Sequence, residues 1–209
     1  MFSRRQDLMH LWRSEELLEQ ADKEGVLCFY GHGASNPYLH FSNFHEHRAF
    51  RFALPACCHR GDVVFSKVVD RVEFAEKAIM MCKAAVFGDY DIYDRLIHAY
   101  NPRDCKKLGR QVRNFDVDVW DAVVLTVAEE VVFQKFSKVR DLTPLLMRTG
   151  DSVIAESTRG DLNWATGANA SDASAEKPWQ WRGTNILGWA LMQARARIRR
   201  ERSSEATHG

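Results

Sequence analysis

The feature that most constrains the fold is a series of apolar residues, three or four positions apart, that ends just before Gly88. Its members are Val72, Ala75, Ile79, Cys82 and Val86. This spacing predicts an amphipathic helix with one buried face. Asp70 and Glu73 have the spacing of a capping box and would begin the helix, while Gly88 is a typical C-terminal stop. A helix of this kind needs other elements to cover its apolar face.

Further stretches of the chain predict those elements. The same spacing predicts helices over residues 1–24, 92–100, 102–112, 120–131 and 184–201. Apolar runs near Gly or Pro predict strands at 26–30, 49–54, 63–69 and 153–155. Residues 160–178 are rich in Gly, Ala, Ser, Asn and Asp, which is typical of a functional or mobile loop. The expected fold class is therefore mainly α with a small β-sheet, a single-domain α+β fold.

The domain organisation follows from the length and from these elements. A chain of 209 residues suits one compact domain. We expect an N-terminal helical extension over residues 1–24, the main domain over 25–202 and a disordered tail over 203–209.

Charge, hydropathy and cysteine usage exclude several classes of protein. Lys and Arg number 29 against 28 Asp and Glu, so the whole chain has no net attraction to a polyanion or an anionic membrane. Its apolar runs are far shorter than the ~20 residues of a membrane span. Five cysteines without a C-x-x-C spacing argue against a disulfide framework and a zinc ribbon. We expect an intracellular protein, cytoplasmic or nuclear, with no metal and no cofactor.

The central helix also predicts a polar site. Glu76, Met80, Lys83 and Phe87 form the stripe beside its apolar face. Glu76 and Lys83 are seven residues apart and share a face at ~10 Å of axial rise. That spacing suits two polar groups that reach into one ligand pocket. The alternative is a pair of ordinary solvated charges.

Basic and aromatic residues offer further ligand contacts. Arg103, Lys106, Arg110 and Arg113 recur at helical spacing and could hold phosphates, with Gly109 allowing a ligand near the backbone. Their alternative is a solvated helix face. Four tryptophans in or near the 160–178 loop could stack on a flat base or simply anchor the loop: Trp164, Trp179, Trp181 and Trp189. The arginines from Arg195 to Arg202 favour a solubilising surface with a secondary role near nucleic acid.

Five segments of the chain, taken in order, resemble a known family. They are Phe29-Tyr30 with Phe41-Ser42-Asn43-Phe44, Ala75-Glu76-Lys77 with Met81-Cys82-Lys83-Ala84 and Phe87-Gly88-Asp89, Lys107-Leu108-Gly109-Arg110 with Asn114-Phe115 and Trp120, Asp161-Leu162-Asn163-Trp164, and Trp181-Arg182-Gly183-Thr184-Asn185-Ile186-Leu187-Gly188 with Leu191-Met192. Over about residues 26–197 the chain resembles the NADAR family, also called YbiA-like, whose name refers to NAD and ADP-ribose. It departs from the family pattern at Ala165, where the family usually has Gly, and at Lys77 and Cys82, where Gln is common.

The resemblance implies a YbiA-like fold and an activity. The expected protein is an N-glycosidase or ADP-ribosyl hydrolase that cleaves the bond between ribose and a base. Its implied substrate is ADP-ribose on guanine in DNA or RNA, with riboflavin-pathway intermediates as the alternative. We expect no membrane and no obligate protein partner. A module that binds ADP-ribose or NAD without catalysis, and a purely structural interaction domain, are the rival interpretations.

The reaction assigns roles to three residues. Glu76 is the expected general acid and base. Lys83 either anchors the ligand or, as a neutral amine, attacks the anomeric carbon of an opened ribose to give a Schiff base. Asp161 is expected to hold ribose hydroxyls or the attacking water.

The remaining expected site residues bind the ligand. Arg110 and Lys106 would hold the diphosphate beside Gly109. Trp164 or Phe44 would stack on a ring, and Asn43 and Asn185 would supply hydrogen bonds. Phe29 and Trp120 complete the expected binding set.

Overall fold

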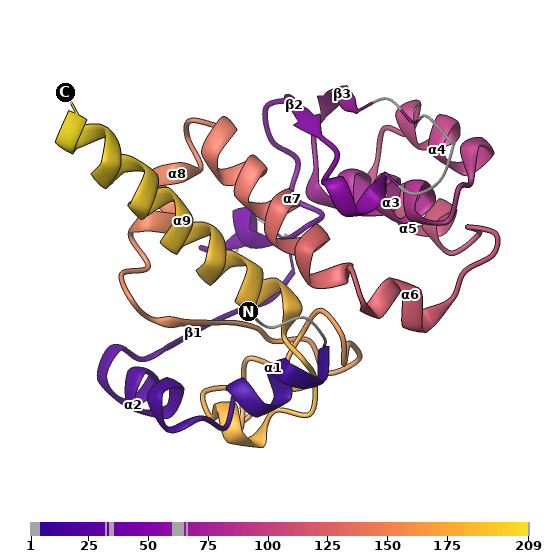
Figure 1. The fold of residues 1–209 in the computed structure, drawn as a ribbon. Coiled ribbons are helices and arrows are strands. Elements are labelled where there is room, and N and C mark those ends of the chain that lie inside the picture. The colour runs from indigo at the N-terminus through magenta and orange to yellow at the C-terminus, as the bar shows by residue number, and fades with distance from the viewer. Residues whose placement is uncertain (1–4, 32, 34–35, 60–64, 66, 209) are drawn as a thin grey trace.

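The computed structural model describes residues 5–31, 33, 36–59, 65 and 67–208 (Figure 1). The described chain is mainly helical and its strands form two separate pairs, so the predicted α+β class is confirmed. β1 (Val26–Phe29) runs parallel to β4 (Val153–Glu156), and β2 (Phe50–Ala53) runs antiparallel to β3 (Val68–Val72). The expected small sheet is thus two two-stranded sheets.

The helices account for most of the described residues. They are α1 (Arg5–Leu11), α2 (Glu15–Glu24), α3 (Ala75–Val86), α4 (Tyr90–Ile97), α5 (Pro102–Gly109), α6 (Val117–Asp121), α7 (Val124–Lys138), α8 (Thr143–Met147) and α9 (Ile186–His208). Short 3₁₀ turns lie at Leu39–Phe41, Ala56–Cys58 and Pro178–Gln180. No described helix is long and apolar enough to cross a bilayer.

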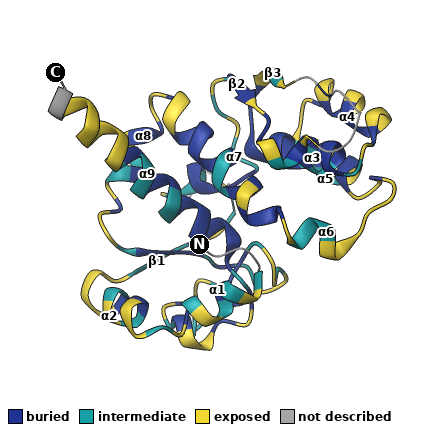
Figure 2. Cartoon of the chain, viewed as in Figure 1, coloured by how far each residue is buried: buried dark blue, intermediate teal, exposed yellow. Residues whose placement is uncertain are grey.

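The core is centred on α7, which packs against α9 and α3 (Figures 1 and 2). The apolar residues that the helical spacing singled out on α7 and α9 are buried: Val124, Val127, Val131, Leu187, Leu191, Ala194 and Ile198. Trp120 belongs to the separate helix α6, so the single predicted helix over 120–131 is in fact two. Because both faces of α7 are largely covered, the core lies along this helix.

The predicted start of the central helix is wrong. Asp70 lies in β3, and α3 begins at Ala75 after an N-cap, Phe74, whose side chain makes no capping bond. Val72, expected on the helix, pairs with Phe50 on β2. β-branched residues suit a paired strand, and here strand pairing prevails over the local capping pattern. The first part of the predicted strand 63–69 lies largely outside the described residues.

The N-terminal segment forms two helices that pack against the rest of the chain. Ser14 caps α2 and interrupts the single helix predicted over residues 1–24. Leu8 and Trp12 are completely buried. The Trp12 ring meets Trp181 edge-on with centroids 5.2 Å apart, and its Nε1 donates to the Thr184 carbonyl at 2.9 Å. These contacts tie the segment to the loop before α9.

The C-terminal helix is longer than predicted. α9 continues to His208, where the sequence predicts a helix end near 201 and a disordered tail over 203–209. Ser203 and Ser204 donate back to the carbonyls of Arg199 and Arg200, which adds side-chain bonds to the last turns. These turns are exposed, so no apolar pattern marks them in the sequence.

Candidate active site

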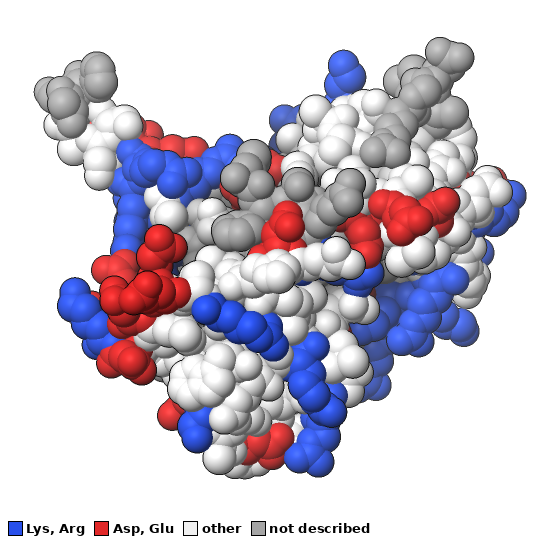
Figure 3. Space-filling view, turned by 60° about the horizontal axis from the view of Figure 1, so that its bottom comes forward, with Lys and Arg blue, Asp and Glu red and all other residues white. Residues whose placement is uncertain are grey.

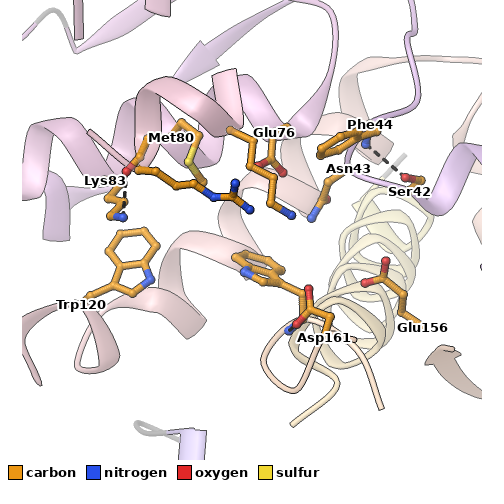
Figure 4. A pocket seen from close by; sticks show the side chains of 13 residues that line it. Ser42, Asn43, Phe44, Glu76, Met80, Lys83, Trp120, Glu156 and Asp161 are labelled. Atoms are coloured by element: carbon orange, nitrogen blue, oxygen red, sulfur yellow. Dashed lines mark hydrogen bonds between the residues drawn. The ribbon is translucent and has the colours of Figure 1, made fainter. Parts of the chain in front are cut away.

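One pocket collects most of the predicted site residues (Figure 4). It is lined by Ser42, Asn43, Phe44, Glu76, Met80, Lys83, Lys106, Gly109, Arg110, Trp120, Glu156, Asp161 and Trp164. Its volume is about 190 Å³. Pockets that enclose a whole drug-sized ligand measure about 300–1,000 Å³. This one therefore fits a sugar or a single ring system and leaves the rest of a larger ligand outside.

The helix α3 supplies one wall, as its sequence spacing predicts. Glu76, Met80 and Lys83 point from successive turns toward the pocket (Figure 4). Glu76 is buried, and burial raises the pKa of its carboxyl to about 7. Lys106 and Arg110 lower that pKa and Asp161 raises it, but burial is the largest effect. The carboxyl therefore exchanges its proton near neutral pH.

The strand β4 and the loop after it supply the opposite wall. Asp161 faces the pocket, and its Oδ1 accepts the backbone N–H groups of Asn163 and Trp164, each at 2.8 Å (Figure 4). This Asx-type turn places Trp164 in the pocket wall.

Glu156, the last residue of β4, also lines the pocket and was missed by sequence reasoning. Burial, then Asp161 and Glu76, raise the pKa of its carboxyl to about 8, although Lys106 lowers it. The sequence feature that could have identified Glu156 is its position as an acidic residue directly after the apolar residues 153–155 of the predicted strand.

Lys83 lies at the side of the pocket where α3 meets α5. Its Nζ donates to the Gly109 carbonyl at 2.9 Å and lies 4.1 Å from the centroid of the Phe115 ring. Within the described residues no carboxylate pairs with it, and burial lowers its pKa. A Cβ at Gly109 would lie 1.9 Å from the Met80 sulfur. The glycine therefore permits close packing of α5 on α3.

The predicted basic stripe divides between two environments. Lys106 and Arg110 line the pocket, with the Lys106 Nζ 5.5 Å from the centroid of the Phe44 ring. Arg113 turns away and pairs with Asp89 and Asp91. Arg103 lines a second, more open pocket, which shares Phe44 with the first.

Two predicted ligand contacts do not reach the pocket. Phe29 is 2% exposed and packs edge-on against Phe41 in the core, with centroids 5.5 Å apart. Asn185 is completely buried, and its side chain bridges β4: Oδ1 accepts the Glu156 N–H at 3.0 Å and Nδ2 donates to the Ile154 carbonyl at 2.9 Å. Both residues support the pocket wall from the core side and do not contact the pocket.

The four tryptophans near the loop have different roles. Trp164 lines the pocket, as does Trp120 on α6. Trp181 and Trp189 are buried in the core, whereas Trp179 is exposed outside the pocket. Of the four tryptophans near the loop, only Trp164 is therefore placed to stack on a ligand in the pocket.

A buried lysine supports the segment that carries Asn43. The Lys135 Nζ donates to the carbonyls of His40 and Ser42 at 2.8 and 2.9 Å. The Asn43 carbonyl in turn accepts the Glu76 backbone N–H at 2.9 Å, at the start of α3. The Asn43 side-chain oxygen is buried without a hydrogen-bond partner among the described residues, so it is available to a ligand.

Arg5 on α1 connects two parts of the pocket wall from outside. Its guanidinium donates to Asp121 at the end of α6 and to Asn163 in the loop after β4. Each partner lies next in sequence to a pocket tryptophan, Trp120 or Trp164.

No cluster of His, Cys, Asp and Glu suited to a metal ion is found in the described part of the chain.

The chain is similar in sequence to several known proteins. The sequence pattern of the NADAR domain matches residues 28–199. An N-glycosidase of Acanthamoeba polyphaga mimivirus is 33% identical over 138 residues, which cover 64% of this chain and 81% of that protein. An N-glycosidase of Nostoc punctiforme is 30% identical over 175 residues, covering 83% and 94% of the two chains.

A solved structure extends the likeness to the fold. The NMR structure of the Escherichia coli protein YbiA aligns with a TM-score of 0.61 at 21% identity, covering 85% of this chain and 86% of that one. The domain match spans most of the chain, including every residue of the pocket. The chain therefore belongs to the NADAR domain family.

Proposed function

We propose that this protein is an N-glycosidase that hydrolyses the bond between ribose and a base, with ADP-ribose on guanine in nucleic acid as its substrate. The observation that carries the proposal is the buried Glu76 carboxyl, with a pKa of about 7, in a pocket that also holds Asp161, Lys106 and Arg110. Family membership and two relatives named N-glycosidases support it.

The chemistry of the bond explains why a carboxyl of this kind is useful. Cleavage at the anomeric carbon requires a proton on the leaving base and stabilisation of positive charge on the sugar. A group with a pKa near 7 both gives and accepts a proton at neutral pH. Glu76 meets that requirement, and Asp161 on the opposite wall stabilises the developing positive charge or holds the ribose hydroxyls.

Lys83 provides an alternative, covalent route. If the ribose ring opens, the neutral amine attacks the anomeric carbon, the base departs with a proton, and water hydrolyses the resulting Schiff base. The lowered pKa of Lys83 and the lack of a carboxylate partner among the described residues favour the neutral amine.

The size and charge of the pocket agree with a large substrate that binds at its ribose end. A volume of about 190 Å³ accepts the reacting ribose, while Lys106 and Arg110 are suited to the adjoining phosphates. On the face shown in Figure 3, Lys and Arg side chains gather in several separate groups. The chain as a whole has a net charge of only +1, so attraction to the polyanion is local.

A direct assay tests the proposal. A DNA oligonucleotide carrying guanine-linked ADP-ribose is incubated with the protein and with Glu76→Gln, and released ADP-ribose is measured by mass spectrometry. Glu16→Gln, at an exposed site on α2, is the matched control. Release by the parent and the control, but not by Glu76→Gln, is expected. Borohydride should trap a protein–ribose adduct only if Lys83 acts covalently, and full activity of Lys83→Ala would exclude that route.

Two other outcomes favour other functions. A rise in melting temperature with ADP-ribose but no release would favour the binding module. Cleavage of riboflavin-pathway N-glycosides alone would favour that substrate class. Ala165, the departure from the family pattern, is completely buried and does not line the pocket, so it gives the binding module no structural support.

A further inference from the structure

Glu156 is held rigidly by its backbone. It is the last residue of β4 and stands in register with Phe29 on β1. Its N–H donates to the Asn185 side chain at 3.0 Å and its carbonyl accepts the Thr166 N–H at 2.8 Å. The strand pairing, the residue just before α9 and the loop after β4 therefore fix this residue without help from its side chain.

The side chain of Glu156 has no hydrogen-bond or ion-pair partner among the residues that the structure describes. Its Oε2 is completely buried and makes no hydrogen bond within the described part of the chain. A buried polar group without a hydrogen-bond partner destabilises the fold. The side chain therefore does not contribute a bond that holds the fold. A ligand in the pocket would supply the missing partner.

The carboxyl faces two others across the pocket. Glu76 points inward from α3, while Glu156 and Asp161 point inward from β4 and the loop after it (Figure 4). Three carboxyls in so small a space cannot all be ionised without strong repulsion. Burial, and after it Asp161 and Glu76, raise the pKa of Glu156 to about 8, so Glu156 retains its proton at a pH where Glu76 begins to lose one.

We propose that Glu156 is a further catalytic residue, which donates the proton to the leaving base while Glu76 on the facing wall accepts a proton from the attacking water. This inference rests on the proposed N-glycosidase function and divides between two residues the proton transfers otherwise assigned to Glu76. The bond from the anomeric carbon to nitrogen breaks, and its electron pair takes the Glu156 proton. Water forms the new bond to carbon and releases its proton to Glu76, so no oxidant or reductant is required.

The test compares two leaving groups. Glu156→Gln keeps the shape of the side chain but cannot transfer a proton, and Glu19→Gln, exposed on α2, is the matched control. With guanine-linked ADP-ribose, Glu156→Gln should lower kcat by ~10²–10⁴-fold, the range of general acid catalysis. KM should stay nearly unchanged. The fall of kcat at alkaline pH, present in the parent and in Glu19→Gln, should disappear.

A leaving group that needs no proton separates chemistry from structure. NAD⁺ releases nicotinamide from a ring that is already cationic, so the loss of turnover in Glu156→Gln should be much smaller with NAD⁺ than with the guanine substrate. Parent-like turnover of the guanine substrate by Glu156→Gln, an unchanged alkaline limb, or an equal loss with both substrates would overturn the inference. If the parent itself releases nothing from the guanine substrate, the proposed function fails. This outcome is distinguished from failure of the Glu156 inference because it is seen in the parent protein alone, without any variant.

Discussion

Two buried carboxyls lie at opposite ends of α3 and differ in their hydrogen-bond partners and in their pKa values. Glu76 is in the first turn and is 6% exposed, whereas Asp89 follows the helix and is 2% exposed. Asp89 accepts bonds from the Arg113 backbone at 2.8 Å, from the Arg113 guanidinium at 2.7 Å and from the Ile92 N–H at 3.3 Å. No described residue donates a hydrogen bond to the Glu76 carboxyl.

The pKa values of the two carboxyls follow their partners. Bonding to Arg113 lowers the pKa of Asp89 to about 2, while burial raises that of Glu76 to about 7. Burial alone therefore does not identify a functional carboxyl. A buried carboxyl whose bonds are all supplied by the protein stabilises the fold, and one that lacks them is available to a ligand.

The largest expected difference between the two is in catalysis. Glu76→Gln should reduce kcat on the guanine substrate by ~10²–10⁴-fold, because the amide cannot exchange a proton. Asp89→Asn should leave kcat close to that of the parent, since Asp89 does not line the pocket. Steady-state hydrolysis of both variants measures this. A comparable loss in Asp89→Asn, in protein that remains folded, would show that the contrast between the two sites is mistaken.

The second difference is in stability. Asp89→Asn should lower the free energy of unfolding by about 1–3 kcal/mol, because an amide N–H₂ replaces one of the two oxygens that accept from Arg113. Glu76→Gln should cause no such loss. Urea denaturation monitored by circular dichroism compares the two. Equal stability of Asp89→Asn and the parent would mean that the bonds to Arg113 add little to the fold.

The third and smallest difference is in the pH dependence of stability. The pKa of Glu76 is raised from 4.5 to about 7 on folding, so its stabilising contribution is full below pH 4.5 and is lost as the pH rises through 7. Asp89 has the opposite sign: its pKa is lowered from 3.8 to about 2, so its contribution is present above pH 3.8 and is lost as the pH falls through 2.

Thermal unfolding across pH checks these signs. Between pH 5 and pH 8 the melting temperature of Glu76→Gln should rise steadily relative to the parent, because only the parent loses the contribution of the protonated carboxyl. Asp89→Asn should show a constant deficit over the same range. A parallel course of Glu76→Gln and the parent would indicate that Glu76 titrates near its ordinary pKa.

Local pattern was enough to predict part of this site. Glu76, Met80 and Lys83 share a helix face, and helical spacing fixes that relation whatever the helix packs against. Lys106 and Arg110 were predicted on the same grounds. The family resemblance added Asn43, Asp161 and Trp164, which lie in loops where spacing carries no such information.

The missed and misplaced residues depend on contacts between distant parts of the chain. Glu156 enters the pocket because β4 pairs with β1, far away in sequence. Asp70 fails as a helix cap because its strand pairs with β2. Asn185 belongs to a family motif, yet its bonds go to β4, so a motif residue can serve the scaffold of a site without touching a ligand.

The contacts of Arg5 have a consequence for the positions of the two pocket tryptophans, Trp120 and Trp164. One guanidinium, 116 residues from one partner and 158 from the other, joins the segments that carry both indoles. The relative position of the two indoles therefore depends on a contact from α1, which supplies no residue of the pocket itself. A substitution at Arg5 can therefore change the shape of the pocket while every residue that lines it stays the same.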